Sequence, residues 1–261
     1  MLVRTWNLFH GNSVPRGRIA YLEQMIRFAA ADHPDVLLLQ ELPLWAFAEL
    51  EVWSGMQAFT QVAHRTPLGA TLGGKITKLD PGLLRSAVSG QGNAILIDRS
   101  LEPFDYHALV LNTPDFRRDQ SGSLDLGLAE RLAWAKERRV LQAIRAARPD
   151  GRRILIANLH ATHHASDRRL AEAEVRRAAD FFLALTQPDE IEVFGGDFNV
   201  LAASDAIRYL LDEGFSGPGG GVDHVLVRGS AATPPERWPD ERRRIDGVLV
   251  SDHAPLEVRI A

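Results

Sequence analysis

Polar residues that can bind a cation or a phosphate recur at the ends of strand-like segments of this sequence. In α/β proteins, the ends of strands commonly carry the functional residues. One acidic residue at such a position is more often a helix cap or a turn former, so catalysis requires several groups to converge. Five short groups meet this description: Trp6-Asn7, Gln40-Glu41, Asn158-Leu159-His160, Gly195-Gly196-Asp197-Phe198-Asn199 and Ser251-Asp252-His253.

Two carboxylates in these groups have the chemistry of a magnesium site. Mg²⁺ prefers octahedral oxygen ligation and is typically held by one or two protein carboxylates together with water and substrate phosphate. Glu41 and Asp252, both at predicted strand ends, supply such a pair. The adjacent His253 carries an imidazole, which can remove or relay a proton near neutral pH.

A second pair, Asp197 and Asn199, has the chemistry of a phosphate site. The two residues are two positions apart, so their side chains point to the same side if the strand geometry persists through the turn. The carboxylate can orient a water molecule. The amide can donate a hydrogen bond to a phosphoryl oxygen without competing for the metal.

The order of these groups resembles that of the endonuclease/exonuclease/phosphatase superfamily, the metal-dependent phosphoesterases that include pancreatic deoxyribonuclease, abasic-site endonucleases, inositol phosphatases and neutral sphingomyelinases. Gly-Asp-Phe-Asn followed by Ser-Asp-His-x-Pro is a highly specific combination. The matching motifs span nearly the whole chain: Thr5-Trp6-Asn7, Leu38-Leu39-Gln40-Glu41, Gly92-Asn93-Ala94-Ile95-Leu96, Asn158-Leu159-His160, Gly196-Asp197-Phe198-Asn199 and Ser251-Asp252-His253-Ala254-Pro255.

The resemblance implies a metal site and a fold. Glu41 is expected to be the principal ligand, with Asn7 and Asp252 contributing directly or through water, and the cofactor is expected to be Mg²⁺, with Mn²⁺ as the alternative. In abasic-site endonucleases an acid lies two residues after the first-motif asparagine, whereas here that position is Phe9, which favours one tightly bound ion over two. The implied fold is a deoxyribonuclease I-like four-layer α/β sandwich, with two packed, mostly antiparallel sheets flanked by helices, forming a single domain over residues 1–261.

The resemblance also implies the catalytic roles. His160 and Asn199 would contact the scissile phosphate, and Asp197 would orient or activate the attacking water. His253 would act as general base or as electrostatic partner, and both alternatives stay open.

Two aspartates compete as the partner that orients His253. Asp223 matches the aspartate that orients the final histidine of the family, whereas Asp246 lies in a competing Ile-Asp-Gly-Val match. We favour Asp223 because a strand and a loop still separate it from the Ser-Asp-His motif.

Other polar and aromatic residues fit structural roles better than catalytic ones. His10 is a weaker candidate for part of the missing first-motif acid. The remaining histidines and arginines in these regions are expected to be solvated or to cap helices, and the tryptophans to lie in the core: His163, His164, Arg138-Arg139, Arg242-Arg243-Arg244, Trp6, Trp45 and Trp134.

Composition limits the class of protein. The chain has 261 residues, of which 45% are hydrophobic and 25% charged, as expected for a globular protein. A net charge of −4 argues against a polyanion binder held by bulk charge, and the lack of cysteine excludes disulfides, thiolate metal sites and cysteine nucleophiles. Since no signal peptide, membrane span or obligate protein partner is evident, a cytoplasmic protein is expected.

Strand-like and helix-like segments alternate along the chain without an internal repeat. The predicted strands include residues 35–40, 153–159, 190–195 and 222–227, and the predicted helices cover 18–31, 167–185 and about 204–213. Residues 65–89 and 113–127 are expected to be long surface loops that set substrate choice.

The favoured function is therefore metal-dependent hydrolysis of a phosphodiester by an activated water, with a nuclease-like preference for DNA or RNA. The alternative substrates are phosphoinositides, sphingomyelin or other small phosphoesters. A catalytically silent binding member of the same fold is the third alternative. The complete set of acids, amides and histidines argues against it.

Overall fold

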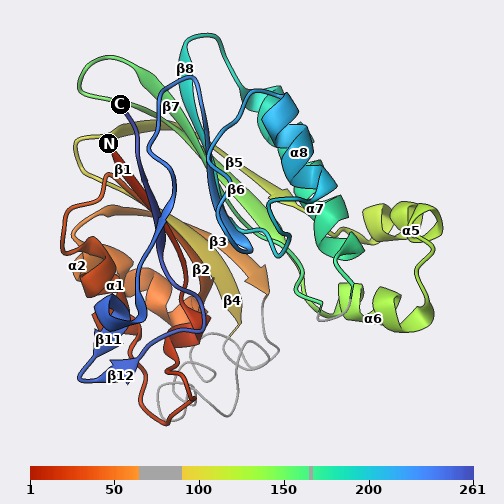
Figure 1. Cartoon of the computed structure of the whole chain (residues 1–261), viewed down its shortest axis with the longest axis horizontal. Coiled ribbons are helices and arrows are strands. Elements are labelled where there is room, and N and C mark those ends of the chain that lie inside the picture. Colours follow the sequence, from red (N-terminus) through yellow and green to blue (C-terminus); the bar gives the residue numbers. More distant parts are fainter. Residues whose placement is uncertain (65–89, 165–166) are drawn as a thin grey trace.

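Two packed sheets with helices on their outer faces build this protein, whose computed structural model describes residues 1–64, 90–164 and 167–261 (Figure 1). The first sheet has the strand order β10-β13-β1-β2-β4-β3. The bounds of these strands are Glu236–Arg237, Leu256–Arg259, Leu2–Asn7, Val36–Leu42, Gln91–Ile97 and Gln57–His64, respectively. The four-layer α/β sandwich expected from the sequence is confirmed.

The second sheet has the order β5-β6-β7-β8-β9, with bounds Glu102–Val110, Val140–Ala147, Arg153–His160, Glu190–Asp197 and Asp223–Arg228. Pairing within the two sheets is antiparallel apart from two parallel pairs, β1 with β2 and β7 with β8. A small separate ribbon pairs β11 (Arg244–Ile245) with β12 (Val248–Leu249).

Helices α1 (Leu22–Ala30) and α2 (Leu50–Ser54) cover the first sheet, and α7 (Arg169–Leu185) and α8 (Asp205–Asp212) cover the second. Helices α5 (Pro114–Ser123) and α6 (Leu128–Lys136) follow β5 and precede β6 along the chain, and they project from the sandwich. Short 3-10 turns form at Phe9–Gly11, Leu44–Glu49 and Asp240–Arg243. None of the helices in the described ranges is long and apolar enough to span a membrane.

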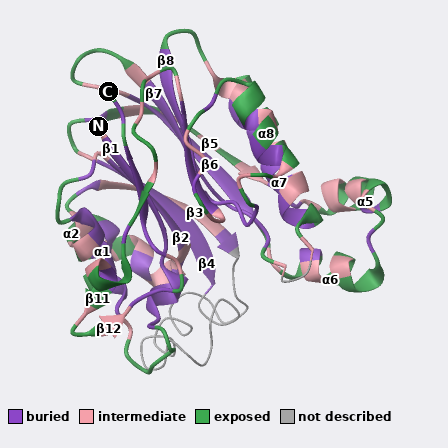
Figure 2. Cartoon of the chain, in the orientation of Figure 1, coloured by how far each residue is buried: buried purple, intermediate pink, exposed green. Residues whose placement is uncertain are grey.

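Three buried apolar layers hold the sandwich together (Figure 2). Leu38 and Ile156 belong to the layer between the two sheets. Met25 of α1 packs behind the first sheet, and Phe182 of α7 stacks on Phe194 of β8 at 5.1 Å between ring centroids. This alternation of apolar side chains toward opposite faces fixes the strand registers, because a one-residue slip would turn each set toward the wrong layer.

The registers bring the ends of the central strands to one edge of the sandwich. Asn7 of β1 pairs with Gln40 of β2, and His160 of β7 pairs with Asp197 of β8. Asp197 in turn pairs with Asp223 of β9. Residues from distant parts of the sequence therefore meet because their strands end at the same level.

Two motif residues tie the sheets together beneath this edge. Gln40 Nε2 donates to Asn158 Oδ1 at 2.7 Å, and Asn158 Nδ2 donates to the carbonyl oxygens of Leu39 and Ala94. Both side chains are fully buried, and their hydrogen bonds from one sheet to the other favour one relative placement of the sheets. These residues therefore support the site without lining it.

Most predicted elements are present, with two corrections. The helix predicted over 18–31 begins only at Leu22, and Ile19 is 62% exposed because it precedes the helix. Residues 113–127 are not one long loop, since Thr113 caps α5 by accepting from the Phe116 N–H and Phe116 packs edge-on against Trp134. Residues 65–89 lie outside the described residues.

Candidate active site

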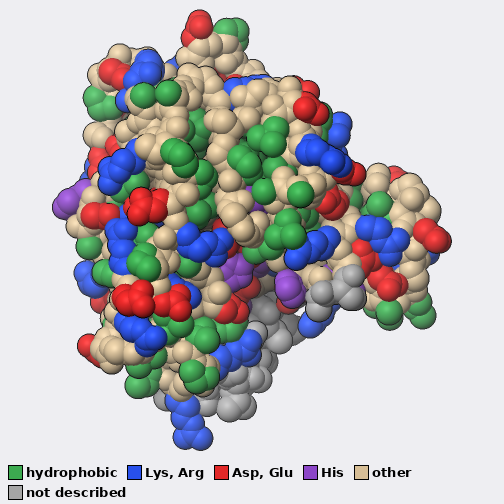
Figure 3. Space-filling model, in the orientation of Figure 1, with side chains coloured by type: hydrophobic (Ala, Val, Ile, Leu, Met, Phe, Trp, Pro, Cys, Tyr) green, Lys and Arg blue, Asp and Glu red, His purple; other side chains and the backbone are tan. Residues whose placement is uncertain are grey.

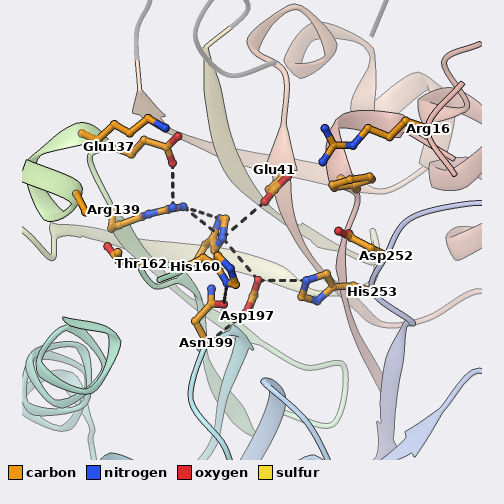
Figure 4. A pocket seen from close by; sticks show the side chains of 14 residues that line it. Arg16, Glu41, Glu137, Arg139, His160, Thr162, Asp197, Asn199, Asp252 and His253 are labelled. Carbon is orange, nitrogen blue, oxygen red and sulfur yellow. Dashed lines mark hydrogen bonds and ion pairs between the residues drawn. The ribbon is translucent and has the colours of Figure 1, made fainter. Parts of the chain in front are cut away.

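A cavity of about 490 Å³ opens at the edge where the strands end (Figure 4). On the surface, histidine side chains show among acidic and basic ones near the centre of the face in Figure 3. The cavity combines charged, amide and imidazole groups with few apolar ones. Its lining comprises Phe9, Arg16, Glu41, Ala133, Lys136, Glu137, Arg139, His160, Thr162, His163, Asp197, Asn199, Asp252 and His253.

Glu41 enters the cavity from a bulge in β2. The pairing of β2 with β4 shifts register between Leu39 and Leu42, and Glu41 adopts a left-handed φ of 54°. Such a bulge redirects a side chain that regular strand geometry would place elsewhere. Burial raises the pKa of Glu41, and the charge of Asp252 raises it further, while Arg139 opposes the shift. The carboxylate is thus held where an additional cation would stabilise its ionised form.

Asn7 links the first strand to the edge of the sandwich where the cavity opens. Its Nδ2 donates to Asp197 Oδ2 at 3.0 Å, while its Oδ1 accepts from the Phe9 N–H at 3.0 Å. A hydrogen bond from the same side chain lowers the pKa of Glu41. Asn7 therefore orients two carboxylates, and its role as a metal ligand stays a prediction.

Asp197 is 1% exposed at the end of β8. Its Oδ1 accepts from the Asn199 N–H at 3.1 Å, and its Oδ2 lies 3.6 Å from His160 Nε2 and 3.8 Å from His253 Nε2. Burial, reinforced by the charge of the neighbouring Asp223, raises the pKa of Asp197 to about 6. A carboxylate with this pKa is ionised at neutral pH and is a stronger base than an ordinary aspartate.

Gly196 places Asp197 by allowing β7 and β8 to approach closely. Its φ is +134°, and a Cβ at this position would lie 2.0 Å from the Leu159 carbonyl oxygen. Only glycine avoids that clash. The glycine of the Gly-Asp-Phe-Asn motif thus has a steric role, and the aspartate has the chemical one.

His253 is held by Asp223. Its Nδ1 lies 2.9 Å and 3.0 Å from the two carboxylate oxygens of Asp223, whereas Asp246 is exposed at the tip of the β11–β12 ribbon. Burial alone would lower the pKa of His253, but the bond to Asp223 and the charges of Asp197 and Asp252 outweigh it and raise the pKa to about 10. The imidazole is therefore protonated at neutral pH, which favours an electrostatic or acid role over that of a resting general base.

The surroundings of His160 shift its pKa in the opposite direction to that of His253. Burial, followed by the charge of Arg139, lowers the pKa of His160 well below its usual value. Arg139 Nη1 lies 3.2 Å from both ring nitrogens, and Arg139 Nη2 donates to Glu137 at 2.9 Å. His160 is thus a neutral imidazole that can offer one N–H to a phosphate.

Arg139 corrects the expectation of a solvated surface arginine, since it is only 6% exposed and lines the cavity. It directly precedes Val140, which pairs with His160 across β6 and β7. The sequence signal was available, because an arginine that precedes a buried strand beside the histidine strand shares its end of the sheet.

Asn199 has a left-handed φ of 52°, and both polar atoms of its side-chain amide have a partner. Its Nδ2 donates to the Ala161 carbonyl at 3.0 Å, and its Oδ1 lies 3.1 Å from His163 Nδ1. Since an amide nitrogen has two hydrogens, one donor remains for a ligand. His163 is exposed, as expected, and it also lines the cavity.

The Ser-Asp-His segment is anchored from below. Ser251 Oγ donates to the Asn7 carbonyl at 2.7 Å, and Trp6 Nε1 donates to the His253 carbonyl at 2.9 Å. Arg243, expected in a solvated basic cluster, is buried and donates to the Ser251 carbonyl at 2.7 Å. Its neighbour Arg242 pairs with Asp32 at 3.2 Å, so these two arginines of the cluster stabilise the fold.

The profile of the endonuclease/exonuclease/phosphatase family matches residues 5–259, which include every motif strand of the site. The chain belongs to this family. No curated protein sequence gives a significant match. Family membership explains why these polar motif residues meet at one cavity, because members of the family are generally hydrolytic phosphoesterases.

Solved structures share the fold of this family member at low sequence identity. A conserved protein of unknown function from Enterococcus faecalis is 15% identical with a TM-score of 0.69, covering 100% of this chain and 99% of its own. The human nocturnin catalytic domain with bound sulfate is 16% identical with a TM-score of 0.64, covering 100% and 94%. Truncated Caenorhabditis elegans TDP2 is 16% identical with a TM-score of 0.59, covering 99% and 96%.

The family is generally dependent on divalent metals, and two sets of groups in the site offer suitable ligands. Glu41 and Asp252 are carboxylates on one cavity, which is the oxygen donor set that Mg²⁺ or Mn²⁺ requires. Ligand atoms of Asp197, Asp223 and His253 also lie within 4.8 Å of one another. Because the His253 imidazole is already bound by Asp223, this second set fits proton transfer better than metal binding.

His10 lies beside Glu41, the expected principal metal ligand, which its sequence position did not suggest. Its Nε2 is 3.3 Å from Glu41 Oε2, and its side chain is 4% exposed. Burial lowers the pKa of His10 to about 4, with the charge of Arg139 adding to the shift and that of Glu137 opposing it. The ring is therefore neutral at physiological pH.

Proposed function

We propose that this protein is a divalent-metal-dependent phosphodiesterase with a nuclease-like substrate preference. The observation that carries the proposal is the meeting, in one cavity, of the Glu41 and Asp252 carboxylates, the basic Asp197 and two histidines held in opposite protonation states. Groups whose environments push their pKa values apart are typical of acid–base pairs in hydrolases. A protein that only binds a partner does not need two histidines in opposite protonation states.

The proposed reaction is in-line attack of water on phosphorus. As the water oxygen bonds to phosphorus, Asp197 accepts a proton from that water, and the ester P–O bond breaks. His253 is protonated and held by Asp223, so it can provide a proton or positive charge to the phosphoryl and leaving oxygens as negative charge develops on them. His160, Arg139 and Asn199 offer donors to the non-bridging oxygens.

Glu41 and Asp252 would hold the metal ion, with Asn7 fixing the Glu41 and Asp197 carboxylates. A divalent ion supplies positive charge that offsets the charge developing on the phosphoryl and leaving oxygens. We propose that this ion is Mg²⁺ or Mn²⁺. The human nocturnin catalytic domain, which shares the fold, binds sulfate, a tetrahedral dianion that resembles phosphate in shape and charge.

Hydrolysis of bis-p-nitrophenyl phosphate by the metal-depleted protein, with and without added Mg²⁺ or Mn²⁺, tests this function. We expect release of p-nitrophenol only when the ion is restored. No release with either ion would support a silent binding member. DNA, RNA, phosphoinositides and sphingomyelin assayed in parallel then rank substrates, and faster turnover of the lipids would overturn the nuclease-like preference.

Replacement of His253 tests the histidine–aspartate pair. We expect His253→Ala to lower kcat by about 10²-fold or more, because a positioned acid or base contributes at least that much. Asp223→Asn should lower kcat less, since the imidazole remains but loses its charge partner. Steady-state kinetics on bis-p-nitrophenyl phosphate give both values, with His107→Ala on the β5 edge as the control. An Asp223→Asn variant as impaired as His253→Ala would show that Asp223 acts directly.

Replacement of Asn199 separates a turn residue from a phosphate donor. Asp tolerates a left-handed backbone, so Asn199→Asp should fold, with a loss of about 1 kcal/mol, or about 2–4 °C in Tm, from the broken bond to Ala161. The lost donor and the added negative charge should lower kcat by about 10²–10³-fold. Thermal denaturation and kinetics check the two effects. Near-wild-type turnover would show that Asn199 only shapes the turn.

A further inference from the structure

His10 occupies a backbone turn that local propensity does not explain. Phe9, His10 and Gly11 all have positive φ values, of 50°, 55° and 81°. A Cβ on Gly11 would lie 2.8 Å from Leu22 Cβ, so this turn is pressed against the first turn of α1. Two consecutive non-glycine residues in the left-handed region are unfavourable, and such strain persists where the surrounding structure imposes it.

The strained turn faces a second strained residue, Glu41. Glu41 has a φ of 54° at the β2 bulge, and its Oε2 lies 3.3 Å from His10 Nε2. His10 lies in the turn that follows β1, and Glu41 lies in the neighbouring strand β2. Both residues of this imidazole–carboxylate contact, His10 and Glu41, therefore have a left-handed backbone conformation.

The contact is longer than a usual N–H···O hydrogen bond, which measures about 2.7–3.2 Å. Two donor atoms that bind one ion at about 2.1 Å, at right angles, lie about 3.0 Å apart. The other ring nitrogen, Nδ1, is buried and has no hydrogen-bond partner within the described ranges. Glu41 is thus the polar group toward which the structure directs this ring.

A purely structural role would be filled better by an apolar side chain. His10 is 4% exposed, and an imidazole at such a position leaves Nδ1 unpaired where an apolar side chain would leave no polar atom unpaired. A nitrogen donor beside a carboxylate has chemical consequences instead. Mg²⁺ prefers oxygen ligands and retains water, whereas Mn²⁺, a first-row transition ion, accepts an imidazole nitrogen beside its oxygen ligands more readily than Mg²⁺ does.

We propose that His10 is a nitrogen ligand, through Nε2, for the divalent cation held by Glu41, and that it biases the site toward Mn²⁺ over Mg²⁺. The proposal rests on the metal-dependent function proposed above. It adds a residue outside the motif set and a preference between the two candidate ions.

Metal binding to His10→Asn and His10→Gln, without substrate, tests the inference. Asn tolerates the left-handed backbone but is too short to reach Glu41, whereas the Gln amide reaches about as far as Nε2. We expect His10→Asn to weaken Mn²⁺ binding by about 10–100-fold, and Mg²⁺ binding by less than about 3-fold, in calorimetric titrations. His10→Gln should regain Mg²⁺ affinity through its amide oxygen.

Pulsed electron paramagnetic resonance of the Mn²⁺-loaded protein provides the direct readout. With ¹⁵N-labelled histidine, the wild type should show imidazole nitrogen coupling that falls in both His10 variants and is unchanged in His107→Gln on the β5 edge. Unaltered coupling and Mn²⁺ affinity in a folded His10→Gln protein would overturn the role of His10 alone. Wild-type protein that binds neither ion would overturn the metal-dependent function as well.

Discussion

Glu41→Gln is expected to abolish metal-dependent hydrolysis, lowering kcat by about 10³-fold or more, while the fold is retained. The carboxylate reaches the cavity from a bulge where its backbone is left-handed, and burial raises its pKa. Glutamine has nearly the same shape but lacks the charge that the ion must neutralise. Kinetics at saturating Mg²⁺ or Mn²⁺ and calorimetric titration of the ion check the expectation.

Glu23→Gln on α1 is the matched control, because Glu23 is a half-exposed surface glutamate paired with Arg27. It should retain wild-type rate and ion affinity. If Glu41→Gln instead keeps its ion affinity and loses only rate, Glu41 acts on the substrate and another residue holds the metal. That outcome would contradict the assignment of Glu41 as principal ligand.

Asp197→Asn is expected to lower kcat by about 10³-fold, within the range for loss of a general base. Asp197 receives donors from Asn7 and Asn199, and burial beside Asp223 raises its pKa to about 6. The amide cannot accept the proton of the attacking water. Steady-state kinetics give the loss, and Asp180→Asn on the exposed face of α7 should be unaffected.

We expect Asp197 to set the acid limb of the wild-type pH profile. The pKa of Asp197 is about 6, so the carboxylate is ionised above that pH and protonated below it. Because only the ionised form accepts a proton, kcat/KM should fall about tenfold per pH unit below about pH 6. The limb should be absent from the residual activity of Asp197→Asn. An acid limb that survives the substitution would assign it to another group.

The fold could be predicted from the sequence, and the structure brings the motif residues singled out by their local chemistry to one cavity. Glu41 and Asp197 lie at the ends of the apolar strands β2 and β8, whereas His253 lies in the loop before β13, which pairs with β1. All three side chains line one cavity. The choice of Asp223 over Asp246 also agrees with the contact in the structure. Short motifs succeed here because each combines a steric requirement, as at Gly196, with a chemical one.

The features of the site that could not be predicted from the sequence depend on contacts between distant segments. Arg139 looked like half of a surface pair, and only the pairing of β6 with β7 brings it to His160. His10 looked incidental because its contact with Glu41 requires two left-handed turns that no pattern encodes. Helix α5 was missed because its polar composition outweighed the Thr113-Pro114 start signal.

Hydrolysis of bis-p-nitrophenyl phosphate in ¹⁸O-labelled water, by protein stripped of metal and then reloaded, tests the central claim most directly. We predict that restored Mg²⁺ or Mn²⁺ gives p-nitrophenyl phosphate carrying one ¹⁸O atom, that stripped protein gives none, and that Glu41→Gln and Asp197→Asn give little. Product without ¹⁸O, or equal product from stripped and reloaded protein, would contradict metal-dependent attack by an activated water.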